Sequence, residues 1–340
     1  MLGLRNPPAA VVQAGFVPVI DLGPARSSAS GRQAVARAID RACEESGFLV
    51  VVGHGVDEGL VDLMYAVTRA FFRLAPETKA EAAVIEGDNG SLRGWKRFGG
   101  YVAAGNGIET PPDLCELFTY NRLGDTGVAE RSGLGDRIGE LNSPNQWPAE
   151  PPKFRETWLT YYAIMERLAS EIMQLLALGL DLPEDFFDGK IDHHMSNLTA
   201  NWYYPLSAPP LPGQFRKGPH SDWGSLTILY QDEVGGLQVV DRSASWVDVP
   251  CIPGSFVINI GDLMAVWTND RWVSTVHRVL APTGEQANRA RISIPFFHQP
   301  NFDAVVECLP SCLEPGASPR HAPVTSGAWL RQKATAAYGA

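Results

Sequence analysis

The second half of the chain constrains the fold most, because from Leu198 onward it consists of short β-forming runs separated by turn residues. Each run is rich in β-branched or aromatic residues, and no helical pattern stands between consecutive runs. Short strands at such close spacing are typical of an antiparallel sandwich or barrel, such as a jelly roll. The runs cover residues 198–204, 225–230, 236–240, 245–249, 256–260, 275–280 and 291–297.

The first half is mainly helical in its pattern. Apolar residues recur at helical spacing in three segments, and Asp57 is placed to cap the second of them. Residues 87–152 are rich in Gly, Pro and Asn, so we expect loops with short elements there. The last residues, 327–340, fit either a terminal helix or a mobile tail. The predicted helices cover residues 31–46, 57–72 and 154–180, and two further predicted strands cover residues 17–22 and 48–52.

These two patterns predict an α+β chain in which a mainly helical N-terminal region and flanking helices accompany a jelly-roll core. A chain of 340 residues, 45% of them hydrophobic, is long enough to bury a large core.

Composition and charge exclude several partners. The net charge is −10, whereas binding to a nucleic-acid backbone or to an anionic membrane requires a basic face. The N-terminus lacks a basic start followed by a long apolar stretch, and no apolar run approaches the length of a membrane span. The five cysteines are few and scattered, as in a protein with reduced thiols. We therefore expect a soluble cytoplasmic protein.

Three residues form a candidate metal site. His220 and Asp222 are separated by one residue, so on an extended chain their side chains point to the same face. His277 lies in a later run, which a jelly roll can fold back opposite them. Two imidazoles and one carboxylate leave three octahedral positions open, which is the ligand set of Fe(II) oxygenases, whereas a structural zinc site is closed. The bland alternative is a set of ordinary core or surface histidines.

Arg291 and Ser293 follow on the next run and form a candidate carboxylate receptor. Strand alternation places both on one face, where a guanidinium and a hydroxyl together offer three donors. The alternative is a surface ion pair, because arginine is mostly exposed. The run is otherwise almost wholly apolar, which favours a buried Arg291 that needs an anion.

Short motifs in a fixed order surround these residues. They comprise residues 219–229, 235–239, 260–262, 277–279 and 291–293 in the β-rich half, and residues 17–21, 45–48, 53–55 and 71–77 near the N-terminus. Together they resemble the isopenicillin N synthase-like family of Fe(II)/2-oxoglutarate-dependent dioxygenases. The resemblance implies a distorted double-stranded β-helix core. It divides the chain into an N-terminal non-haem dioxygenase region (1–150), a supporting helix and connection (151–195), the jelly-roll core (196–300) and a C-terminal extension (301–340).

The resemblance also implies what the candidate residues bind. Fe(II) would be held by His220, Asp222 and His277. The distal carboxylate of 2-oxoglutarate would be bound by Arg291 and Ser293, and O2 would be the second cosubstrate.

A further motif of the family lies before the first metal ligand, where many members carry Asn-x-Tyr-Pro. Here Asn201-Trp-Tyr-Tyr-Pro205 has one residue more between Asn and Pro. We expect Tyr204, directly before Pro205, to be another cosubstrate contact, and Asn201 to be a further candidate. For Tyr203, core packing and cosubstrate contact are equally good interpretations.

The activity that the resemblance implies is oxidation of an unactivated C–H bond of a small molecule, with release of succinate and CO2. The outcome would be hydroxylation, or desaturation or cyclisation, and specialised metabolism such as antibiotic biosynthesis is the suggested setting. Two alternatives stay open. One is an Fe(II) oxidase of the isopenicillin N synthase type that uses no 2-oxoglutarate, and the other is a non-catalytic receptor for a small acid.

Three aromatic residues are candidates for the wall of the substrate pocket. Phe297 shares the face of its run with Arg291, and Trp223 directly follows Asp222. Phe118 lies at the end of a segment in which we expect a specificity loop. For Trp223 and Phe118, ordinary core packing is an equal alternative. Neither the prime substrate nor the oligomeric state follows from the sequence.

Overall fold

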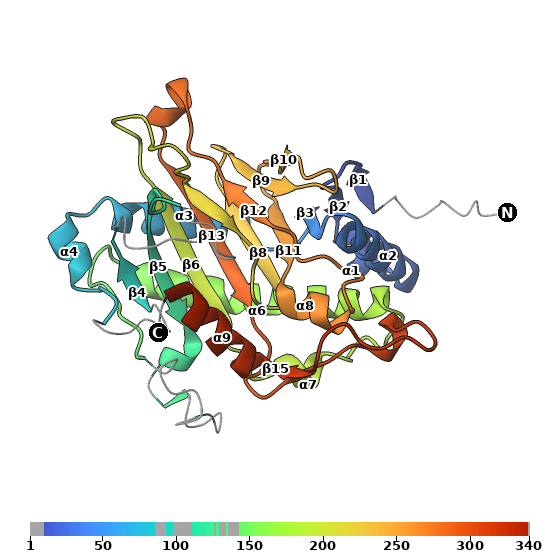
Figure 1. Cartoon of the computed structure of the whole chain (residues 1–340). Helices are drawn as coiled ribbons and strands as arrows, with labels where there is room; N and C mark the ends of the chain where they lie inside the picture. Colours follow the sequence, from blue (N-terminus) through green and yellow to red (C-terminus); the bar gives the residue numbers. More distant parts are fainter. Residues whose placement is uncertain are drawn as a thin grey trace.

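Two facing β-sheets with helices packed on the outside of the larger one form the molecule (Figure 1). The structure is a computed structural model that describes residues 10–85, 93–97, 110–125, 127–128, 134 and 143–338. No helix in these ranges is both long and apolar enough to cross a membrane.

The larger sheet has nine strands within the described ranges, in the order β1-β2-β3-β11-β8-β13-β6-β5-β4, and all neighbours are antiparallel except β2 and β3. Strands from the first 121 residues therefore form both ends of this sheet, and the later strands form its middle. The bounds are β1 (Val11–Gln13), β2 (Val19–Asp21), β3 (Phe48–Val52), β11 (Phe256–Ile260), β8 (Leu226–Gln231), β13 (Arg291–His298), β6 (Asn197–Tyr203), β5 (Cys115–Asn121) and β4 (Gly94–Lys96).

The smaller sheet is fully antiparallel in the order β10-β9-β12-β7. Its apolar residues Val239 and Val279 pack with Val50 and Val257 of the larger sheet, which closes the jelly roll. Its strands are β10 (Trp246–Asp248), β9 (Leu237–Val240), β12 (His277–Val279) and β7 (Lys217–His220). A separate short pair consists of β14 (Val305–Val306) and β15 (Val324–Thr325).

Helices α2, α3 and α6 bury the other face of the larger sheet, whereas α9 lies at the cavity. Alternation along β11 shows the division, since Val257 packs toward the smaller sheet while Ile258 packs in the helical core. Tyr162 of the long helix contacts Phe296 of β13, with ring centroids 5.2 Å apart. The helices are α1 (Gly23–Ser27), α2 (Ala29–Glu45), α3 (Glu58–Phe72), α4 (Pro76–Ala80), α6 (Phe154–Gly179), α7 (Asp188–Ile191), α8 (Asp262–Trp267) and α9 (Ser326–Tyr338), and single turns cover Arg122–Gly124, Gly284–Asn288 and Pro310–Cys312.

The predicted fold class is confirmed, and several elements match closely. The strand over residues 48–52 and the strand over residues 256–260 have the predicted bounds. Asp57 caps α3 as predicted, because its side chain accepts a hydrogen bond of 2.8 Å from the Leu60 amide. At the C-terminus, the helical interpretation is correct and α9 forms.

The sequence patterns missed several short elements, and three of the missed elements position the site or interrupt the β runs. Strand β5 lies in the segment expected to be loop, and β7 precedes the first histidine of the candidate metal site. Helix α8 interrupts the β runs, which were expected to follow one another without helix. The N-terminal region is also less purely helical than expected, because it contributes strands to both ends of the larger sheet.

Candidate active site

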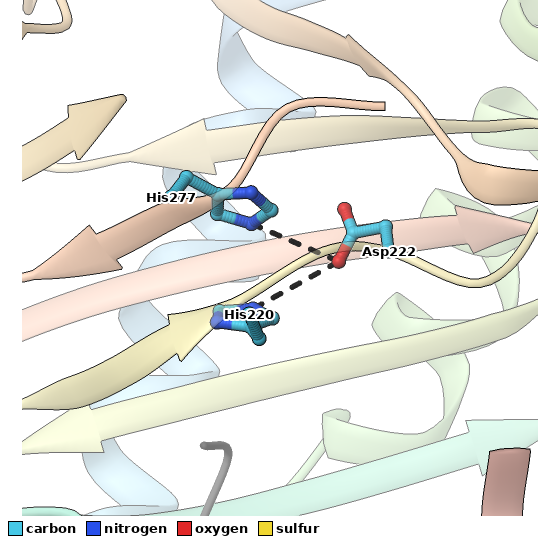
Figure 2. A group of neighbouring side chains, drawn as sticks. All are labelled: His220, Asp222 and His277. Carbon is cyan, nitrogen blue, oxygen red and sulfur yellow. Dashed lines mark ion pairs between the residues drawn. The ribbon is translucent and has the colours of Figure 1, made fainter. Parts of the chain in front are cut away.

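The three candidate metal ligands converge at one end of the smaller sheet. His220 ends β7 and His277 begins β12, and the two residues are directly paired across the strands. Asp222 follows in the loop that leads to β8 of the larger sheet. Its Oδ1 lies 3.9 Å from His220 Nε2 and 3.7 Å from His277 Nε2, and Figure 2 shows both imidazoles turned toward this oxygen. One potential ligand atom from each residue lies within 4.8 Å of the others.

Backbone carbonyls fix the protonation of both imidazoles. His220 Nδ1 lies 2.8 Å from the Gly218 carbonyl and His277 Nδ1 lies 3.1 Å from the Thr275 carbonyl. Because a carbonyl only accepts, Nδ1 carries the proton and donates, and Nε2 keeps its lone pair for a metal. Burial, followed by the neighbouring His277, lowers the pKa of His220 to about 3. The neutral form that a metal ligand requires is therefore favoured.

Asp222 is held so that one carboxylate oxygen faces the histidines. Its other oxygen, Oδ2, accepts hydrogen bonds of 2.6 Å from Thr227 Oγ1 and from Asn259 Nδ2. Burial alone would raise the pKa of Asp222. The two imidazoles and these two donors outweigh it and hold the pKa below its ordinary value. The carboxylate is thus charged at neutral pH.

This donor set fits a divalent iron ion. It offers two neutral imidazole nitrogens and one carboxylate oxygen, all buried or half-buried, and an octahedral ion bound there would keep three positions for other ligands. The sequence patterns missed the two residues that orient Asp222. A signal existed for Asn259, which is the one polar side chain in the otherwise apolar strand β11.

The metal ligands line a cavity whose floor is the larger sheet. On β13, every second residue from Arg291 to Phe297 lines the cavity, whereas Ile294, between them, is buried in the helical core. This is the alternation predicted from the sequence. Trp223 also lines the cavity, as proposed for a pocket wall.

Among the described residues no carboxylate forms an ion pair with Arg291, although the nearby Asp232 feels its charge. The exposed fraction of Arg291 is 0%, and its Nη2 donates to Gln231 Oε1 over 3.1 Å. Its Nε and Nη1 have no hydrogen-bond partner in the part of the chain that the structure describes. Beside it, Ser293 Oγ lies 3.3 Å from Tyr203 Oη and 3.5 Å from Asn201 Nδ2. A buried guanidinium with unmatched donors creates a strong demand for a carboxylate ligand.

The structure places Tyr203 at the cavity and Tyr204 away from it, contrary to the expectation for Tyr204. On β6, Asn201 and Tyr203 line the cavity, and alternation turns Tyr204 to the opposite side. There Tyr204 contacts Trp202 and lies 3.5 Å from the Lys79 ammonium. The additional residue of the motif therefore stands between Tyr203 and the proline, and the spacing from Asn201 is preserved.

The expectation for Phe118 is also wrong, and core packing is correct. Its neighbours on β5, Leu117 and Thr119, line the cavity, so alternation directs Phe118 into the helical core. Its ring contacts Phe154 and Trp158 of α6, with centroids 5.1 Å and 4.9 Å apart.

Comparisons with known proteins agree with this geometry. The family model described as the 2OG-Fe(II) oxygenase superfamily matches residues 195–300. A second model, described as the non-haem dioxygenase in morphine synthesis N-terminal, matches residues 17–150. Together the two models include all the strands of both sheets except β1, which lies before residue 17.

Relatives are similar along most of the chain. The 2-oxoglutarate-Fe(II) type oxidoreductase hxnY of Emericella nidulans is 34% identical over 95% of this chain and 90% of its own length. Validamycin A dioxygenase of Streptomyces hygroscopicus subsp. limoneus is 36% identical over 89% of this chain and 82% of its own. Among solved structures, a full-length Neurospora crassa protein in complex with alpha-KG and thymine has a TM-score of 0.82 and 26% identity, and the match covers 97% of this chain and 100% of that one. The chain therefore belongs to the 2OG-Fe(II) oxygenase superfamily, and it is an oxidoreductase that requires Fe(II), 2-oxoglutarate and O2.

Proposed function

We propose that this enzyme hydroxylates an unactivated C–H bond of a small molecule in specialised metabolism, with His220, Asp222 and His277 as the Fe(II) ligands. Arg291 and Ser293 bind the distal carboxylate of 2-oxoglutarate. Desaturation or cyclisation of the same substrate radical is the alternative outcome at the same site. The likeness to validamycin A dioxygenase supports the metabolic setting.

The observation that carries the proposal is the buried, unmatched guanidinium of Arg291. A dicarboxylic keto acid would suit both halves of the site, because its distal carboxylate could accept from Nε and Nη1, which lack hydrogen-bond partners in the described residues, and its keto acid end could bind a metal held by His220, Asp222 and His277. The Arg291 guanidinium carbon also lies 5.0 Å from the centre of the Tyr203 ring, which fixes the plane in which those donors are presented.

The residues around the three proposed ligands fix the tautomer of both imidazoles and the orientation of the Asp222 carboxylate. Gly218 and Thr275 carbonyls keep both imidazoles in the tautomer that binds through Nε2. Thr227 and Asn259 occupy one oxygen of Asp222 and leave the other for the ion. When bound, Fe(II) would activate O2 at the expense of 2-oxoglutarate, which becomes succinate and CO2.

The test is the stoichiometry of substrate-free turnover. Protein loaded with Fe(II) is given 2-oxoglutarate and O2, and both O2 consumption and succinate are measured. We expect succinate to form in step with O2 consumption. Consumption of O2 without succinate would contradict the proposal that 2-oxoglutarate is oxidised at this site, and no O2 consumption in any sample would contradict the proposed iron ligands.

A matched pair of variants locates the keto acid. Arg291→Gln removes two charge-assisted donors, so the dissociation constant for 2-oxoglutarate should rise about a hundredfold. Arg278→Gln is the control, because Arg278 donates to Gln238 on the smaller sheet, does not line the cavity and carries the same charge. Equal affinities in the two variants would place the carboxylate elsewhere.

A further inference from the structure

A cross-strand row of the larger sheet carries two asparagines beside Phe297. In register, Asn121 of β5 faces Asn197 of β6, Asn197 faces Phe297 of β13, and Phe297 faces Thr227 of β8. Thr227 in turn donates to Asp222. We call these four residues, Asn121, Asn197, Phe297 and Thr227, the asparagine row. The row runs across the sheet from one wall of the cavity to a proposed metal ligand.

The asparagine row lies at the end of the cavity opposite the carboxylate receptor. Phe297 is six residues beyond Arg291 on the same strand, which corresponds to about 20 Å of extended backbone. A keto acid bound to Arg291 and the metal leaves this end of the cavity for a second molecule. The asparagine row is thus part of the substrate region.

Asn121 fixes the orientation of Asn197. Its Nδ2 donates to the Met195 carbonyl over 2.9 Å and to Asn197 Oδ1 over 2.8 Å, and its Oδ1 accepts from the Leu123 amide over 2.8 Å. A backbone carbonyl only accepts and a backbone amide only donates, so this orientation cannot be inverted. Asn197 must therefore present Oδ1 to Asn121, and its Nδ2 has no hydrogen-bond partner in the described part of the chain. Asn197 lines the cavity and is only partly buried.

A threonine pair adjoins the asparagine row. Thr119 Oγ1 and Thr199 Oγ1 lie 3.0 Å apart, and both residues line the cavity. One hydroxyl donates to the other, so the accepting hydroxyl keeps its own proton for a ligand. The substrate region thus offers donors from uncharged groups, the Asn197 amide and one threonine hydroxyl.

The charges around the cavity disfavour a cationic substrate group. Among the cavity-lining residues that the structure describes, Asp222 is the only carboxylate, and it faces the metal ligands. The described lining therefore offers a cationic group no carboxylate other than the proposed metal ligand, and a buried charge without a partner is costly.

Apolar side chains complete the substrate region. Phe297 belongs to the asparagine row itself, Leu123 and Met195 flank Asn121, and Leu330 of α9 also lines the cavity. An aromatic face and aliphatic walls suit a flat or apolar ring rather than a flexible polar chain.

We propose that the substrate carries an uncharged hydrogen-bond-accepting group, the carbonyl oxygen of an amide, lactam or imide, attached to an apolar or aromatic ring. The carbonyl oxygen accepts from Asn197 Nδ2 and the ring packs on Phe297. The inference rests on the proposed function, because it takes the second ligand of the cavity to be the substrate.

The test uses three probes that share one ring, which are benzamide (neutral), benzoate (anionic) and benzylamine (cationic). Their dissociation constants are measured by calorimetry on wild-type protein loaded with Mn(II) and 2-oxoglutarate. We expect benzamide to bind at least about tenfold more tightly than benzylamine and than benzoate, since an unmatched charge in a buried site is costly.

Asn197→Asp is the decisive variant. A carboxylate at this position still accepts from Asn121, so the contact that anchors the side chain is kept, while the Nδ2 donor becomes an anionic acceptor. We expect the preference to invert, with benzylamine binding more tightly than benzamide. Asn269→Asp is the matched control, because Asn269 Oδ1 accepts from the Arg320 amide and the residue does not line the cavity. This control should keep the wild-type preference.

Every other result overturns the inference. Wild-type protein that binds benzylamine or benzoate more tightly than benzamide, or that binds none of the three, contradicts it, and so does an Asn197→Asp variant with the wild-type preference. The affinity for 2-oxoglutarate is measured first in the same samples, and substrate-free succinate formation is measured in parallel samples loaded with Fe(II). If 2-oxoglutarate binds and succinate forms, a failure concerns the substrate class alone. If neither occurs, the proposed function itself fails.

Discussion

The two ends of the cavity present opposite chemistry to a ligand. At one end Arg291 is fully buried, and two of its donors have no hydrogen-bond partner among the described residues. At the other end Asn197 and the threonine pair are neutral, and each is positioned by another side chain. The comparison teaches that one buried guanidinium is enough to bind a carboxylate ligand. Discrimination among neutral ligands depends instead on side-chain hydrogen bonds between neighbouring strands, which orient the donors.

The largest effect is expected where both ends meet, at the metal. Asp222→Ala removes the only negative charge among the metal ligands and leaves Thr227 and Asn259 without an acceptor. The dissociation constant for Mn(II), measured by calorimetry, should rise by more than about a hundredfold, and succinate formation should cease. Circular dichroism of the variant controls for folding. An unchanged Mn(II) affinity in this variant would show that Asp222 is not a metal ligand.

Phe297→Ala should affect the neutral end alone. Loss of a large aromatic contact removes about 2 kcal/mol of apolar burial, so the dissociation constant for benzamide should rise about thirtyfold. The affinities for 2-oxoglutarate and Mn(II) are measured alongside and should stay unchanged. An unaltered benzamide affinity would remove Phe297 from the substrate wall.

A pair of tyrosine variants sharpens the charged end. Tyr203→Phe removes the hydroxyl that contacts Ser293, so the affinity for 2-oxoglutarate should fall about fivefold. Tyr204→Phe should leave that affinity unchanged and instead lower the free energy of unfolding by about 1 kcal/mol, because Tyr204 hydrogen-bonds to the buried Glu116. Titrations with 2-oxoglutarate and urea unfolding curves measure the two effects. A larger loss of affinity in Tyr204→Phe would reverse the assignment.

The smallest effect is expected from Thr199→Val. This substitution removes one hydroxyl of the threonine pair at nearly constant volume, so the affinity for benzamide should fall about threefold. The affinity for 2-oxoglutarate, measured in the same way, should not change. A loss confined to 2-oxoglutarate would show that the threonine pair belongs to the charged end.

Most of the charged end could be predicted from the sequence, because each inference there depends on a single strand. Alternation along one run is enough to place Arg291 and Ser293 on a common face. The choice between Tyr203 and Tyr204 failed because the alternation along the strand was counted from the wrong residue. Counting back from Pro205 rather than from Asn201 shifted the phase by one residue, and a shift of one residue moves a side chain to the opposite face of the sheet.

The neutral end could not be predicted, because it depends on the register of several strands. Asn121 lies on β5, whose residues are buried on both faces and show no alternation of apolar and polar side chains. Because no strand was predicted there, the sequence could not show that Phe118 points away from the cavity, or that Asn121 pairs with Asn197. Strand β7 was missed because its four residues include a glycine and a proline, which are found in edge strands such as this one.

The positions of the metal ligands have a consequence for the stability of the fold. His220 and His277 belong to the smaller sheet, whereas Asp222 is hydrogen-bonded to β8 and β11 of the larger sheet. An ion bound by all three residues would link the two sheets of the sandwich. The stability of the folded enzyme would therefore depend on the supply of metal. At a free metal concentration of a hundred times the dissociation constant, metal binding would add about 2.7 kcal/mol to the free energy of unfolding. Chelation should therefore weaken the packing of the two sheets at the edge strand β7, which among the described strands pairs with β12 alone.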